Sequence, residues 1–256
     1  MTFMTDVGFP DRGVLDRYNA YKQMCEHGEM VEANGARYLK WSAGERVELW
    51  TRVEGGRPGP LFYTYYSGEA RMKVALIEKT PRSEPTLSDG AFLCRSGACA
   101  GEGWLAGRLP FVFDTPDYHL YHEVSIPRLC DVQLAGFAFS MKGYEDEEEF
   151  EEEHPADEDG YCWDYKYFVP AYYLCPRGDG GELQPASVNV SGYVRSSDIV
   201  TNPATGLDFC WVRLETIGGE IAIVCSPDKI DGYVVEGGIA TSYCYLYGRV
   251  LKDDCN

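Results

Sequence analysis

The chain has 256 residues, of which 41 are acidic and 23 are basic, so its formal net charge is -18. Hydrophobic residues make up 45% and aromatic residues 14%, which is enough apolar side chain for a packed core and excludes a disordered acidic tail. Because contacts to phosphate need clustered Lys and Arg, the charge argues against a nucleic-acid binder and against a protein of anionic membranes.

The first residues, MTFMTDVGFPDRG, are acidic where a signal peptide needs a basic region followed by an apolar run. No segment approaches the roughly 18 consecutive apolar residues of a membrane helix. We therefore expect a cytoplasmic protein with no membrane partner. In that compartment the ten cysteines favour buried structural thiols over disulfides or a metal site.

The amino-terminal part predicts one helix followed by a β-meander. Apolar residues recur at steps of three and four between Leu15 and Cys25, and Gly28 follows as a helix end. The pattern then changes to a period of two with glycine-containing turns, which is typical of short antiparallel strands. Strands are expected at residues 47–53, 62–66, 72–77 and 132–139. The stretch from Leu109 to Pro127 contains three prolines, so we expect irregular edge structure there.

An acidic segment follows the last of these strands. Residues 145–185 contain 14 acidic and 2 basic side chains and so carry -12 of the net charge of -18. Its densest part, Glu145–Asp159, has no Lys or Arg. Repulsion between like charges favours an extended or weakly helical, solvated segment. The run is interpreted as a connector or insert, and a protein partner that binds it is the functional alternative.

The carboxy-terminal part predicts four strands. Alternating apolar positions run from Val188 to Val194, from Cys210 to Thr216, from Ile221 to Cys225 and from Ile239 to Leu251. The loop TNPATG and the pair Gly218-Gly219 provide the turns.

The motifs VNVSGYV, FCWVRLET-GG-EIAIV and GGIATSYCYLYGRV resemble the strand order of an OB-fold, a Greek-key barrel found in many oligomer-binding modules. The resemblance covers about 65 residues and implies a fold but no activity. Four strands are evident where that fold has five, so either the amino-terminal half supplies the fifth strand or the barrel is open. The whole chain is also similar to uncharacterised bacterial proteins, which implies no function.

A short internal similarity links the two halves. The sequence WLAGRL at residues 104–109 resembles YLYGRV at residues 245–250. Six residues are too few to establish a duplication, so two related β units remain a hypothesis.

An aromatic and basic face is the first candidate site. In the last predicted strand Tyr243, Tyr245 and Tyr247 alternate onto one face, and residues of neighbouring strands can join them, namely Tyr193, Arg195, Trp211 and Arg213. Sheets of this type stack bases or sugars on aromatic side chains. The acidic character of the segment favours a sugar, peptide or protein ligand over nucleic acid, provided that the three tyrosines form an exposed stripe.

The segment DTPDYHLYHE is the densest group of potential catalytic residues. His119 and His122 with Asp117 are the candidates for a metal site, since carboxylates beside imidazoles can hold a metal or transfer protons. A structural role as strand-edge polar groups is the simpler interpretation. The sequence contains no GxSxG motif and no phosphate-loop motif, and no catalytic residue or cofactor is predicted.

The expected fold is mainly β (α+β), with one amino-terminal helix and two β domains. These comprise residues 1–142 and, as an OB-like Greek-key barrel, residues 186–256, with the acidic connector or insert at 143–185. The function expected first is a non-enzymatic binding or protein-interaction module. The alternatives are a metal-assisted hydrolase at His119 and His122 and a structural subunit of a larger assembly.

Overall fold

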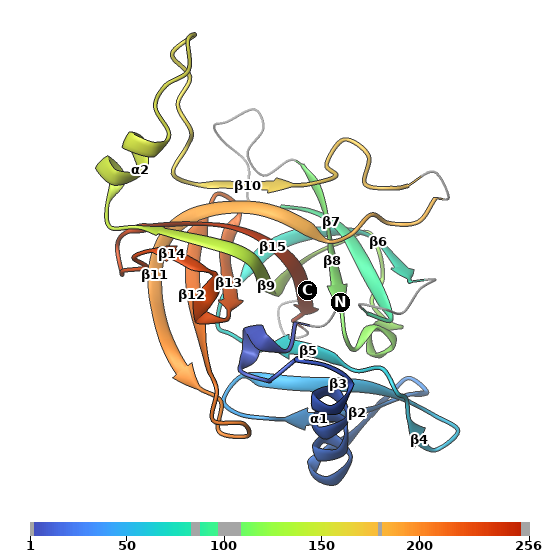
Figure 1. Ribbon diagram of the computed structural model, residues 1–256. Coiled ribbons are helices and arrows are strands. Elements are labelled where there is room, and N and C mark those ends of the chain that lie inside the picture. The colour runs from blue at the N-terminus through green and yellow to red at the C-terminus, as the bar shows by residue number, and fades with distance from the viewer. Residues whose placement is uncertain (1–2, 83–87, 97–108, 179–180, 252–256) are drawn as a thin grey trace.

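The structure is a computed structural model that describes residues 3–82, 88–96, 109–178 and 181–251. Within them the chain is mainly β, with two α-helices and two sheets (Figure 1). One α-helix is the predicted amino-terminal one and the other lies in the acidic segment. None of the helices in these ranges is long and apolar enough to cross a membrane.

Most of the elements are strands, and they follow one another along the chain with few helices between them. The amino-terminal half contains η1 (Thr5–Val7), α1 (Val14–His27), β1 (Glu29–Ala33), β2 (Ala36–Ser42), β3 (Val47–Glu54), β4 (Arg57–Pro58), β5 (Tyr63–Tyr66), β6 (Met72–Pro81), β7 (Gly90–Ser96), β8 (Pro110–Thr115), η2 (Tyr118–Tyr121) and β9 (Arg128–Tyr144). The remainder contains α2 (Glu147–Glu153), β10 (Tyr167–Pro170), β11 (Ser187–Thr201), β12 (Asp208–Thr216), β13 (Gly219–Cys225), η3 (Pro227–Lys229), β14 (Ile230–Gly232) and β15 (Ile239–Val250).

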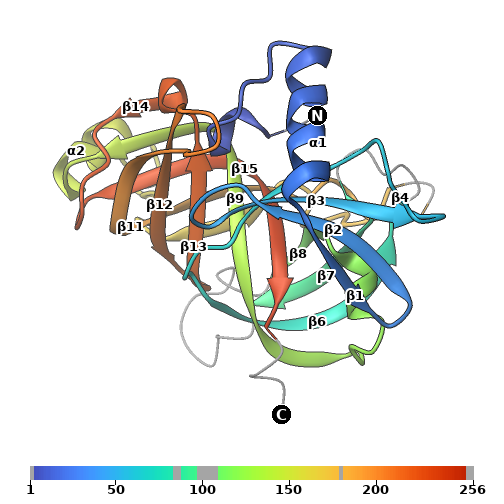
Figure 2. The same ribbon diagram turned by 90° about the horizontal axis from the view of Figure 1, so that it is seen from below.

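Strands β1 to β5 form the small sheet, with β3 at its centre. Helix α1 stands on this sheet, as Figure 2 shows, and ends where the Gly28 amide donates to the Met24 carbonyl. The predicted helix is confirmed, but only part of its predicted apolar face is buried. Ala20 and Met24 are buried, whereas Leu15 and Tyr18 are exposed, because the helix touches the sheet only through its carboxy-terminal part.

The remaining strands form the large sheet, whose pairings contain two closed cycles. The first cycle runs β6–β7–β8–β15–β9 and returns to β6. The second cycle runs β11–β12–β13–β9–β15 and returns to β11. Each cycle has five strands, and both contain β9 and β15. The amino-terminal half thus supplies a strand, β9, to the four strands that were predicted in the carboxy-terminal half.

Where the shared strands β9 and β15 pair, each places a glycine opposite a leucine of the other. Leu134 lies opposite Gly248, and Gly136 lies opposite Leu246. A Cβ atom on Gly136 would lie 2.7 Å from Ile223 of β13, and one on Gly248 would lie 2.5 Å from Phe113 of β8. The Gly136 position is also crowded by Cys244 of β15, at 2.6 Å, so a larger side chain at either glycine would force its neighbours to move.

The structure corrects the expectation for residues 109–127. Strand β8 crosses the first part of this stretch, and its Phe111 and Phe113 are buried. Pro110 begins the strand and Pro116 follows it, so neither proline interrupts the hydrogen bonds within the strand. In the similar pair of sequences WLAGRL and YLYGRV, residues 104–108 lie outside the described residues.

The two predicted domains share hydrogen-bonded strands, because β9 of the first pairs with β13 and β15 of the second. Side chains from both sheets also join one hydrophobic core. The domain boundaries themselves stay a prediction. Cys210, Cys225 and Cys244 are buried free thiols within strands.

Candidate functional site

The structure divides the predicted aromatic face into three groups. Tyr245 and Tyr247 belong to the core and are only 3% and 2% exposed. The Tyr245 hydroxyl donates to Asp114 at 2.7 Å, and both rings contact Phe3. The expectation of an exposed three-tyrosine stripe is therefore wrong, because the amino-terminal segment covers this face of β15. Tyr243 is 39% exposed and packs its ring on Phe139.

The second group faces the acidic segment. The Tyr193 hydroxyl donates to Glu147 of α2, and Arg195 forms an ion pair with Glu215. Lys166 pairs with the same Glu215 carboxylate. These polar groups are already partnered within the chain, so they tie the acidic segment to β11 and β12.

The third group lies on β12. Trp211 lines a hollow of the surface, whereas Arg213 lies outside it, near Glu69 at 3.8 Å and Glu220 at 4.0 Å. A pocket of about 360 Å³ lies between the β11–β12 hairpin and the small sheet. We call it the Trp211 pocket, and it is lined by Gly44, Glu45, Arg46, Val47, Tyr66, Asp198, Val200, Thr201, Asn202, Pro203, Phe209 and Trp211. Its volume suits a small ligand, and its lining combines aromatic walls with a few polar groups, as ligand sites commonly do.

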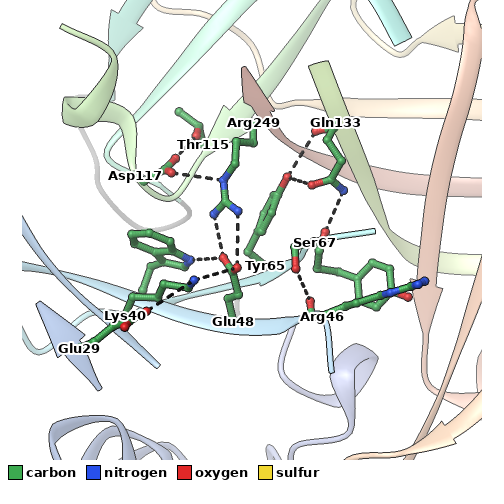
Figure 3. Close-up of polar contacts among 12 residues, drawn as sticks. Glu29, Lys40, Arg46, Glu48, Tyr65, Ser67, Thr115, Asp117, Gln133 and Arg249 are labelled. Atoms are coloured by element: carbon green, nitrogen blue, oxygen red, sulfur yellow. Dashed lines mark hydrogen bonds and ion pairs between the residues drawn. The ribbon is translucent and has the colours of Figure 1, made fainter. Parts of the chain in front are cut away.

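The turn between β2 and β3 places the cationic group of this pocket. Arg46 has a φ of 65°, in the left-handed region that side chains other than glycine and asparagine rarely adopt. Its carbonyl accepts hydrogen bonds from the Ser67 amide at 2.7 Å and the Ser67 hydroxyl at 3.2 Å, the second of which Figure 3 shows. Two donors thus hold a backbone conformation that costs free energy, a situation that is concentrated at functional sites.

The Arg46 guanidinium lies over the Trp211 ring, 5.5 Å from its centroid, and pairs with Glu69 at 2.6 Å. This is cation–π geometry, so the Trp211 face can attract polar or charged groups. On the same side, the exposed Asp198 lies opposite Trp211 in the β11–β12 register and adds a carboxylate to the lining.

The wall of this pocket contains the buried hydroxyl group of Tyr66. The side chain is 1% exposed, and its hydroxyl makes no well-formed hydrogen bond within the described residues, although the Arg46 guanidinium lies close enough to interact with it. Burial raises the pKa of Tyr66 to about 12, although the nearby Arg46 guanidinium acts to lower it. A buried hydroxyl without a partner costs on the order of 1–3 kcal/mol. Such a group in a pocket wall is a donor that a bound molecule can satisfy.

A second polar cluster begins two residues further along β3, and Figure 3 shows it beside Arg46. The Glu48 carboxylate accepts from Arg249 at 2.7 Å and from the Trp50 indole at 2.7 Å, and Lys40 lies 3.2 Å away. Arg249 also reaches Asp117 at 3.4 Å. We call this cluster the Glu48–Arg249 network. Its charges are buried and paired, which is the arrangement of a structural cluster.

The candidate metal residues do not come together as a metal site. Asp117 accepts from the Thr115 hydroxyl at 2.6 Å and belongs to the Glu48–Arg249 network. His119 Nε2 lies 3.1 Å from an Arg52 terminal nitrogen, which can only donate, so the imidazole lone pair is occupied. Within the described ranges, no group of three His, Cys, Asp or Glu side chains is arranged to hold a metal ion.

The acidic run Glu145–Asp159 is partly helical. Asp146 caps α2 by accepting from the Glu149 amide at 2.9 Å, and Phe150 is buried against Tyr144. The segment projects from the large sheet in Figure 1. A protein partner for this segment stays a prediction.

Sequence reasoning found Trp211 but missed Arg46 and Tyr66. Neither residue belongs to a local motif, and both come from the small sheet, about 150 residues earlier in the chain. The only local signal was Gly44, two residues before Arg46, which indicates a turn but not what the turn approaches.

Comparison of the chain with protein-family models, with curated proteins and with solved structures found no match.

Proposed function

We propose that this protein is a non-enzymatic binding module that takes a carbohydrate in the Trp211 pocket. The observation that carries the proposal is the Trp211 pocket, whose wall combines the Trp211 ring with the buried Tyr66 hydroxyl, a group without a well-formed hydrogen bond. A sugar can donate to Asp198 and, where it displaces the Arg46 side chain, it can accept from the Tyr66 hydroxyl and place its ring against the indole.

The strand pairings support the proposal. The second cycle has the five strands that the OB resemblance requires, with β9 as the strand contributed by the amino-terminal half. In OB-folds, oligosaccharides and oligonucleotides bind on the second and third strands and at the loop between the first and second. Counted from β11, the corresponding places here include β12, which contributes Phe209 and Trp211 to the Trp211 pocket, and the loop at residues 202–207, which contributes Asn202 and Pro203. Strand β13 contributes no lining residue.

The charge of the pocket favours a neutral sugar over nucleic acid. Its lining includes the carboxylates of Glu45 and Asp198 and the single cation Arg46. Arg46 is itself paired with Glu69. A phosphate backbone would meet like charge here, whereas an uncharged polyhydroxyl compound would not.

Calorimetric titration with neutral oligosaccharides tests the proposal, with cellohexaose, maltohexaose and chitohexaose as probes. We expect at least one to bind and Trp211→Ala to weaken its binding at least about fivefold, since stacking on an aromatic ring contributes roughly 1–3 kcal/mol. Trp163→Ala is the matched control, because Trp163 is 59% exposed and lies outside the pocket.

Three results would contradict the proposal. The first is that no probe binds the unmodified protein, and the second is that Trp211→Ala binds as well as Trp163→Ala. The third is that a single-stranded oligothymidylate binds the pocket in preference to every sugar.

A further inference from the structure

A second pocket, of about 210 Å³, lies where the β1–β2 turn meets η2. We call it the His119 pocket, and it is lined by Asn34, Gly35, Ala36, Arg52, Lys79, Tyr118, His119, Tyr121 and His122. Four of these side chains are basic and none is a carboxylate. In a chain with a net charge of -18, this is a local reversal of sign.

The adjoining pocket shows that the reversal is specific. A hollow of about 330 Å³ shares Arg52 and His119 with the His119 pocket. Its lining includes Glu54 and Asp89. Of these two pockets, the His119 pocket is the one that has basic side chains and no carboxylate in its wall.

Lys79 provides a fixed positive charge in this pocket. Its ammonium group donates to the carbonyls of Tyr121, His122 and Val124 at 3.1, 2.8 and 3.1 Å. These three bonds use all three of its protons. The charge is thus held in place by the end of η2 and the residues after it.

Arg52 provides directed donors. Its Nη1 contacts His119 Nε2 at 3.1 Å, and its Nε lies 3.2 Å from Glu54. Its Nη2 makes no hydrogen bond among the residues that the structure describes. Because Arg52 can only donate, His119 is neutral and carries its proton on Nδ1. Burial, and after it the Arg52 charge, lowers the pKa of His119.

We propose that the His119 pocket binds the oxyanion group of a small molecule, a phosphate or a carboxylate. Arg52 and the imidazoles of His119 and His122 donate to the oxygens, while Lys79 contributes charge. A guanidinium fork matches both groups, and charge-assisted hydrogen bonds are the strong ones. The site is separate from the Trp211 pocket, with which it shares no lining residue.

Imidazole NMR signals test this proposal directly, because the chain contains four histidines. We would titrate the protein with inorganic phosphate and, separately, with acetate at constant ionic strength. The signals of His119 and His122 are expected to shift, while those of His27 and His154, which lie outside the pocket, stay in place. Whichever of the two anions causes the shift identifies the oxyanion.

Arg52→Gln supplies the matched variant. We expect it to weaken the affinity for the shifting anion at least about tenfold. Arg37→Gln, an exposed arginine of β2 outside the pocket, should leave the affinity within about twofold. Unchanged His27 and His154 signals in both variants establish that the fold is intact.

Three outcomes would overturn the proposal. The first is that the signals of all four histidines shift together, and the second is that neither anion shifts any of them. The third is that Arg52→Gln binds the anion as tightly as Arg37→Gln does. A shift of His119 and His122 with zinc ions but not with the anions would also overturn it and favour the metal site.

Discussion

Arg46 lies in the turn before β3 and Glu48 lies two residues later, in β3 itself. The two residues belong to polar clusters that differ in how completely their hydrogen bonds are satisfied. Around Glu48 the polar groups are paired: the carboxylate has Arg249, Lys40 and the Trp50 indole. Around Arg46 the backbone is in a left-handed conformation and the Tyr66 hydroxyl makes no well-formed hydrogen bond within the described residues. The first cluster is complete without a ligand, whereas the second is not.

This difference separates structural polarity from binding polarity within one fold. Buried charges that satisfy one another join β15 to the small sheet and need nothing from solvent. A donor that remains unsatisfied in a pocket wall costs free energy until a ligand contacts it. The number of charged residues does not distinguish the two clusters, but the completeness of their hydrogen bonds does.

Breaking the complete cluster is expected to have the largest effect. Arg249→Met leaves Glu48 and Asp117 without their shared cation, and removal of one partner of a buried ion pair costs about 3–5 kcal/mol. Chemical denaturation should show a fall in the free energy of unfolding of this size. Arg37→Met, which breaks the exposed pair with Glu32, should cost less than about 1 kcal/mol. Equal losses in both variants would show that the network is not structural.

Two adjacent tyrosines give a sharper version of the comparison. The Tyr65 hydroxyl donates to the Gln133 side chain, whereas the Tyr66 hydroxyl makes no well-formed hydrogen bond in the described residues. Tyr65→Phe leaves the Gln133 oxygen unpaired and should cost about 1–3 kcal/mol. Tyr66→Phe loses no well-formed hydrogen bond, so its free energy of unfolding should change by less than about 0.5 kcal/mol or increase.

The same pair of variants tests whether the Trp211 pocket uses its unpartnered donor. Tyr66→Phe should weaken sugar binding although it leaves stability intact, and Tyr65→Phe should do the reverse. A destabilised Tyr66→Phe protein would mean that its hydroxyl has a partner, and the contrast between the two clusters would fail.

Acid should weaken the complete cluster by a smaller amount. Burial alone would raise the pKa of Glu48, but Arg249, Lys40 and the Trp50 indole together bring the pKa below its ordinary value. Stability from this carboxylate is therefore full above the ordinary pKa of 4.5 and is lost as the pH falls through the lower folded value. The stability difference between the unmodified protein and Glu48→Gln should shrink as the pH falls below 4.5. A difference that does not depend on pH would exclude this linkage.

Local patterns predicted many of the elements but not their partners. The alternation in residues 188–194 and 210–216 and the Gly218-Gly219 turn indicate β11, β12 and β13 correctly, because period and turn chemistry are local. The apolar segment 132–139 was also predicted to be a strand. Its pairing with β6, β13 and β15 depends on contacts between distant parts of the chain, which no local pattern contains.

The candidate sites illustrate the same limit. Tyr243, Tyr245 and Tyr247 have the alternation of an exposed stripe, but the amino-terminal Phe3 covers two of the rings. The spacing of His119 and His122 suggests a metal site, but Arg52 of β3 lies beside His119 and occupies the ring nitrogen that would bind the metal. In each case the residue that decides the chemistry comes from another sheet or segment, so sequence spacing alone cannot supply it.

The sharing of β9 and β15 means that neither half of the chain is self-sufficient. A cut within the acidic segment would leave the amino-terminal half with β9 but without β15, and the other half with the reverse. Each fragment would then present unpaired strand edges, which favour aggregation. Because each fragment carries the strand that the other lacks, the two are natural candidates for complementation when they are produced together.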